Sequence, residues 1–145
     1  MLEDAEAEDF LEQSRLFSVR QITAATFIGA PIAGALFLAR NYRALGLETA
    51  ARQSLQWGVV ATLLVFLIAY LLPDRFPNSA LPIGYCFAMH QLAGRLQGRA
   101  ISDHLRAGGM KGSWAPVIGW SVLCLVIIVI LIFALFAVLS ILVVC

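Results

Sequence analysis

The longest uncharged stretch of this sequence most limits what the chain can fold into. After Lys111, thirty-four residues follow without a charged side chain. A helix needs about 20 mostly apolar residues, at about 1.5 Å each, to cross the hydrocarbon core of a bilayer. A soluble chain of about 150 residues leaves roughly a third of its surface in water, so it could not bury such a long apolar run. The run therefore predicts a membrane protein.

Three further gaps between charged residues are long enough to cross a bilayer. They cover residues 21–39, 53–73 and 76–94. Charged side chains are costly in the hydrocarbon core, so such gaps locate membrane spans. The composition agrees, because 61% of the residues are hydrophobic and 13% are charged, whereas soluble domains have about 45–50% and about 25%.

The predicted fold is all-α: an integral membrane protein built as a bundle of four transmembrane helices. Ser18 followed by Gln21 predicts a capping box at the start of the first helix. The third span is the least apolar, and a run of its length also suits a re-entrant or interfacial segment. We expect an acidic tail at residues 1–17 and one helical domain at residues 18–145, with spans at about 21–39, 55–73, 80–97 and 114–142.

The basic residues predict an orientation, because Lys and Arg favour the cytoplasmic side of a membrane. With four spans, Arg15, Arg20 and Arg75 fall on one side of the membrane. Seven basic residues fall on the other side, and we therefore expect a multi-pass protein of the bacterial inner membrane with both termini outside. These seven are Arg40, Arg43, Arg52, Arg95, Arg99, Arg106 and Lys111.

Small residues gather in the middle of the first span, at Gly29, Ala30, Pro31 and Gly34. Ala30 and Gly34 are four residues apart and would share one helix face, which lets another backbone approach closely. Pro31 removes a backbone hydrogen bond and should bend the helix. We expect helix packing within the chain, with a homo-oligomer contact or a hinge as the alternative.

A polar pair, His90 and Gln91, interrupts the third span. At helical spacing, Gly84, Gln91 and Arg95 share a face with Ala88 and Gly98. A small, polar face is expected to point to protein rather than to lipid. We expect a hydrogen bond between helices here, and a polar site with a proton-responsive His90 is the alternative.

The connection after the third span is basic, with Arg95, Arg99, Arg106 and Lys111 beside the membrane. Basic residues at this depth attract anionic lipid headgroups by about 1 kcal/mol each. The simpler interpretation is that they only set the topology.

The residue patterns give no indication of an enzyme. The sequence contains no HExxH motif, no Walker loop, no nucleophile–His–acid arrangement and no paired carboxylates in a span. Cys86 and Cys124 lie in apolar segments without the spacing of a disulfide framework or zinc site. The net charge of +1 does not favour nucleic acid. We therefore expect no catalytic residue, no metal site and no cofactor.

Residues 20–46, RQITAATFIGAPIAGALFLARNYRALG, and residues 81–98, LPIGYCFAMHQLAGRLQG, resemble a family of small multi-span proteins of bacteria with no assigned activity. The resemblance implies a helical fold and an inner-membrane location. It carries over no catalytic or binding residue.

The leading functional hypothesis is a non-enzymatic membrane protein that acts by helix association, as an accessory or scaffold subunit. Its partners would be the lipid bilayer and other membrane proteins, or further copies of the chain. The alternative is a small oligomeric transporter or channel. Coupled transport usually relies on a carboxylate within the membrane, and the predicted spans contain none.

Overall fold

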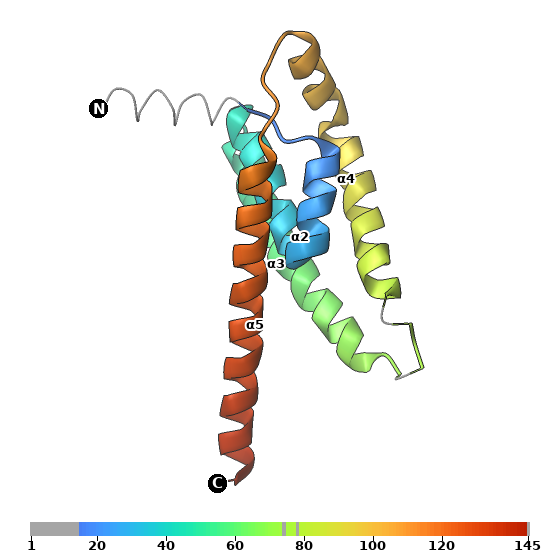
Figure 1. The fold of residues 1–145 in the computed structure, drawn as a ribbon, viewed down its shortest axis with the longest axis vertical. Helices are drawn as coiled ribbons and strands as arrows, with labels where there is room; N and C mark the ends of the chain where they lie inside the picture. The colour runs from blue at the N-terminus through green and yellow to red at the C-terminus, as the bar shows by residue number, and fades with distance from the viewer. Residues whose placement is uncertain (1–14, 74, 78, 145) are drawn as a thin grey trace, which may run out of the picture.

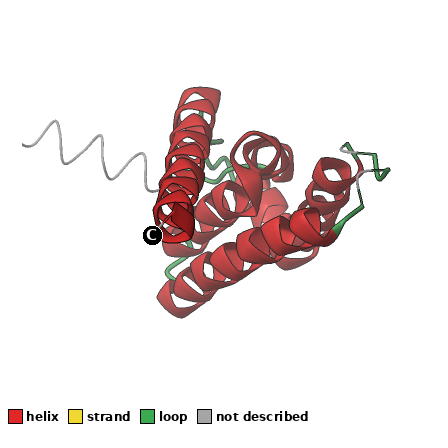
Figure 2. Cartoon of the chain, turned by 90° about the horizontal axis from the view of Figure 1, so that it is seen from below, coloured by secondary structure: helices red, strands yellow, loops and turns green. Residues whose placement is uncertain are grey.

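The described part of the chain is helical, with four long helices joined by short connections (Figures 1 and 2). The computed structural model describes residues 15–73, 75–77 and 79–144, so residues 1–14 of the predicted acidic tail lie outside the described residues. The helices confirm the predicted all-α class. They are α2 (Val19–Ala44), α3 (Glu48–Leu71), α4 (Ala80–Arg106) and α5 (Trp114–Val144).

Three of these helices, α2, α3 and α5, are long and apolar enough to cross a membrane. This supports the prediction of a membrane protein. The four-span bundle is not confirmed, because α4 falls short in apolar character and α2 does not run straight.

Helix α2 is folded in half. The backbone N–H of Phe17 donates to Oδ1 of Asn41 at 2.7 Å, although the two residues are 24 positions apart. A straight helix would separate them by about 36 Å. The rings of Phe17 and Phe37 also meet edge to face, with centroids 4.8 Å apart. The helix is therefore a hairpin of two antiparallel arms, residues 19–28 and 31–44, which Figure 1 shows side by side.

The fold-back occurs at Gly29 and Ala30, whose backbone angles are not helical. Pro31 has no N–H and its ring clashes with the carbonyl four residues earlier, and it also disfavours the helical conformation of the residue before it. Ala30 lies at φ 63°, a conformation that costs about 1–3 kcal/mol for a residue other than glycine. The predicted bend at Pro31 is thus a complete reversal, and Ala30 and Gly34 do not share one helix face.

This hairpin is the centre of the fold. Helices α3, α4 and α5 each pack against α2. The contact between α3 and α4 is slight, and α5 contacts no described helix except α2. The buried apolar cluster joins the hairpin arms to α4 and α5. Its members include Ile22, Phe37, Met89 and Val117. The far half of α5 extends alone beyond the other helices (Figure 1).

The hairpin changes the path of the chain. We name its open end, residues 16–20 and 40–44, the hairpin mouth, and Gly29 with Ala30 the hairpin tip. From the mouth end, α3 leads away, α4 returns and α5 leads away again (Figure 1). Residue 15 and the end of α5 therefore lie at opposite ends of the molecule. The two arms span only about 15 Å and about 21 Å at helical rise, so the segment 21–39 does not form the straight span that was predicted.

Candidate functional site

A buried network of amide side chains closes the hairpin mouth. Besides accepting from the Phe17 N–H, Asn41 donates through Nδ2 to the Phe17 carbonyl oxygen at 2.8 Å and to Oε1 of Gln97 at 2.9 Å. Gln97 donates through Nε2 to the carbonyl oxygen of Leu38 at 2.9 Å. Asn41 and Gln97 are fully buried. The network joins the segment before α2, the second arm and α4.

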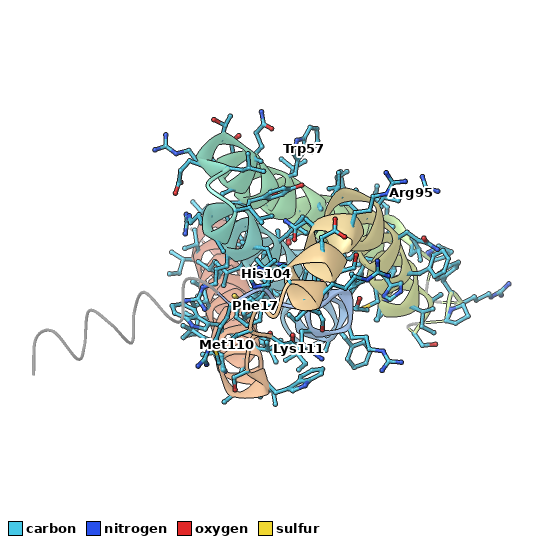
Figure 3. All side chains as sticks on the ribbon, turned by 90° about the horizontal axis from the view of Figure 1, so that it is seen from above. Phe17, Trp57, Arg95, His104, Met110 and Lys111 are labelled. Carbon is cyan, nitrogen blue, oxygen red and sulfur yellow. The ribbon has the colours of Figure 1, made fainter. Side chains whose placement is uncertain are left out.

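A second amide ties the mouth to the start of α5. Gln21 donates from Nε2 to the carbonyl oxygen of Gly112 at 2.7 Å and accepts at Oε1 from the Ser18 N–H at 2.9 Å. The capping box predicted at Ser18 is therefore confirmed. Figure 3 looks onto this end, where Phe17, Met110 and Lys111 lie together.

These amides are neutral, and their described hydrogen-bond partners are backbone groups, each other and the Ser18 hydroxyl, which donates to Gln21. The arrangement fixes the hairpin and offers no nucleophile or general base. The sequence analysis did not single out Asn41 or Gln97, because an amide near the end of an apolar run is also typical of a surface position. The sequence did contain one indication of a buried amide: Asn41 lies between Arg40 and Arg43 at the end of a long apolar segment.

The small residues of the first span contact three different helices. A side chain at Gly29 would meet the Ser121 carbonyl oxygen of α5, and one at Gly34 would meet Thr26 of the opposite arm. In α3, Gly58 faces Ala35 of the second arm. Packing within the chain, rather than a seam between copies, therefore occupies these positions.

The hairpin tip is closed by α3. The reversal leaves the first N–H groups of the second arm without helical partners. The Ile32 N–H donates to Oγ1 of Thr62 at 3.0 Å, and Thr62 in turn donates to the Gly58 carbonyl oxygen at 2.8 Å. Thr62 thus caps an arm that begins in the interior of the molecule.

His90 joins α4 to the first arm, since its Nδ1 lies 3.0 Å from Oγ1 of Thr23. His90 lines an open groove between these two helices with Arg20, Phe27 and Cys86. The groove has a volume of about 410 Å³. The predicted hydrogen bond between helices is present, and it belongs to His90 rather than to Gln91.

The other predicted polar positions of α4 lie elsewhere. Gly84, Gln91 and Arg95 are exposed, and the space beside Gly84 and Gly98 is open. The face of α4 that packs within the chain is the opposite one, with Met89, Ala93, Gln97 and Ile101 buried. Helical geometry correctly grouped the small, polar residues, but the structure turns their face away from the other helices of the chain.

The predicted headgroup residues Arg95, Arg99, Arg106 and Lys111 are exposed. They belong to the second half of α4 and to the connection that follows it, which lie toward the mouth end (Figure 1). Arg40, Arg43 and Arg52 belong to the same end, and the fold-back of α2 adds Arg15 and Arg20 to it. Arg43 lies 3.9 Å from Glu48, an exposed ion pair of little energetic weight. Arg40 lies over the Trp120 ring at 5.0 Å.

Comparisons of the chain with protein-family models, with curated proteins and with solved structures gave no match. The resemblance to small bacterial membrane proteins stays a prediction.

Proposed function

We propose that this chain is a non-enzymatic subunit of the bacterial inner membrane that acts by associating with other membrane helices through the outer face of α4. In this proposal α3, α4 and α5 cross the bilayer, and the α2 hairpin enters and leaves it on the cytoplasmic side. The main support is the exposed, small and polar outer face of α4, which is poorly suited to lipid.

The charge distribution supports this orientation. The chain has ten Lys and Arg residues, and with a re-entrant hairpin all but Arg75 belong to the mouth end. The asymmetry becomes nine to one, whereas four straight spans give seven to three. Because basic residues favour the cytoplasm, the mouth and residue 15 are cytoplasmic in this proposal, and the end of α5 is on the outer side. This proposal differs from the prediction of both termini outside, because it places the two ends on opposite sides of the membrane.

We expect reporter fusions to place the two ends on opposite faces. A green fluorescent protein fused to the N-terminus should fluoresce, and alkaline phosphatase fused after Cys145 should be active, because the first reporter works in the cytoplasm and the second in the periplasm. Insertion of each reporter at Gly46, an exposed turn at φ 74°, provides the matched control and should report cytoplasm. Both ends on one face would show that α2 crosses the membrane.

The outer face of α4 supports association because its polar and small side chains would otherwise face hydrocarbon. The α3 and α5 directions require α4 to return across any bilayer that they cross. Its outer face has a glutamine amide at Gln91 and open space beside Gly84 and Gly98. Glycines let a second backbone approach closely, and an amide in hydrocarbon gains a hydrogen bond by meeting another helix.

We expect Gly84→Leu and Gly98→Leu each to weaken association in native membranes by roughly tenfold, the order expected for the loss of a close helix contact. Co-purification in lipid nanodiscs, with the mass of the complex measured, reports this change. Gly119→Leu is the matched control, because Gly119 is an exposed glycine of α5 with open space around it. If neither α4 substitution reduces the amount of complex that co-purifies, the proposal is wrong.

The second candidate function is a small oligomeric transporter or channel. It is favoured by the broken helix α2, because discontinuous helices build the binding sites of many transporters. Association has the stronger support, because the Ile32 N–H freed at the break already donates to Thr62.

A further inference from the structure

The groove between the first arm of α2 and α4 has a cationic end and an apolar end. Arg20 stands at the mouth end of the groove, one residue into α2. Thr23 and His90 follow one turn deeper. Phe27 and Ile28, next to the hairpin tip, line its deepest part together with Cys86. The lining changes from charged to polar to apolar along the same direction in which a lipid changes from headgroup to acyl chain.

The histidine is held in one orientation. The Thr23 hydroxyl donates its single hydrogen to the Val19 carbonyl oxygen at 2.8 Å. The contact with His90 therefore has Nδ1 as the donor and Oγ1 of Thr23 as the acceptor. Arg20 is exposed and supplies a guanidinium that suits a phosphate.

We propose that this groove binds one anionic phospholipid, of which phosphatidylglycerol is the simplest example. The phosphate lies on Arg20, the glycerol backbone that joins the phosphate to the acyl chains lies beside Thr23 and His90, and an acyl chain lies against Phe27 and Ile28. The inference depends on the proposed membrane embedding, because that embedding places the hairpin, and with it the groove, at the depth of the cytoplasmic leaflet.

A second groove of the chain provides the contrast. It lies between α3 and α4, has a volume of about 470 Å³ and is lined by residues such as Trp57, Met89 and Leu92. No charged side chain lines it among the described residues. It can accept an acyl chain but has no group that selects an anionic headgroup. Charge complementarity therefore favours the α2–α4 groove as the specific site.

Native mass spectrometry of the full chain in mild detergent tests the proposal. The probes are phosphatidylglycerol and phosphatidylethanolamine with the same acyl chains. The unmodified protein should retain phosphatidylglycerol in preference, and Arg20→Gln should reduce that preference by about fivefold, the weight of one basic residue near a lipid surface. Arg52→Gln, which removes an exposed arginine at the same end but outside the groove, should leave the preference unchanged.

A phosphatidylglycerol with a photoreactive acyl chain locates the bound lipid. We expect cross-links to peptides that contain residues 23–28 and 86–90. Equal losses in Arg20→Gln and Arg52→Gln would overturn the proposal in favour of a diffuse electrostatic attraction. Cross-links confined to the α3–α4 groove, or a second copy of the chain in the α2–α4 groove, would also overturn it. Alkaline carbonate tests the membrane embedding separately from the lipid site. If it extracts the unmodified protein from membranes, the proposed embedding is wrong.

Discussion

Replacement of Asn41 by leucine should destabilise the chain by about 3 kcal/mol or more. The variant leaves three buried polar groups without their partner: the N–H and carbonyl oxygen of Phe17 and Oε1 of Gln97. Each unsatisfied buried group costs about 1–3 kcal/mol, and local rearrangement reduces the sum. The free energy of unfolding, measured by titration with dodecyl sulfate in mixed micelles and followed by circular dichroism, reports the loss.

Gln91→Leu is the matched control for Asn41→Leu. It also exchanges an amide for an apolar side chain of similar size, but Gln91 is exposed and has no described hydrogen bond within the chain. The expected change in unfolding free energy is within about 0.5 kcal/mol. If the two variants unfold at the same detergent ratio, the amide network does not hold the hairpin closed.

The number of long helical segments could be predicted from the sequence, whereas their ends could not: α4 continues to Arg106, beyond the predicted end near residue 97, and α3 begins at Glu48 rather than near residue 55. Uncharged gaps identify the helical segments because ionised side chains interrupt apolar packing, and the Ser18 capping box marks the start of α2. The direction in which each helix runs cannot be predicted from these gaps. A gap of apolar residues gives a length, and the same length fits one straight helix or two short antiparallel arms.

The hairpin could not be read from the Gly-Ala-Pro segment alone. Proline and glycine also occur in membrane helices that bend and continue, since neighbouring groups satisfy the freed backbone. The contact of Asn41 with Phe17 closes the hairpin, and this pairing across 24 positions is one that no local pattern encodes. The charge distribution was the available signal, because the nine-to-one asymmetry emerges only when α2 returns to its starting side.

The outer face of α4 shows the same limit. Helical spacing grouped Gly84, Gln91 and Arg95 correctly, because that grouping depends only on 3.6 residues per turn. Whether the group faces inward depends on which face fits the hairpin. Met89 and Ala93 pack there, and Gln97 finds both Asn41 and the Leu38 carbonyl oxygen. The polar side chain that enters the interior is therefore Gln97.

One added methyl group at Gly29 should loosen the contact between the hairpin and α5. A Cβ at this position would lie 2.6 Å from the Ser121 carbonyl oxygen and 3.2 Å from Cβ of Cys124. The carbonyl belongs to a helix backbone and cannot move without shifting α5. Overpacking of this kind costs about 1–3 kcal/mol, so Gly29→Ala should lower the unfolding free energy by that amount.

Gly119→Ala separates this steric effect from the general effect of adding a methyl group. Gly119 lies in α5, near the same contact, but the space around it is open. Alanine favours a helix over glycine by up to about 1 kcal/mol, so this variant should be neutral or slightly more stable. Hydrogen exchange of residues 114–124 should increase in Gly29→Ala and not in Gly119→Ala. Because α2 is the only described helix that α5 contacts, no other contact can compensate, and unchanged exchange in Gly29→Ala would mean that the hairpin tip does not anchor α5.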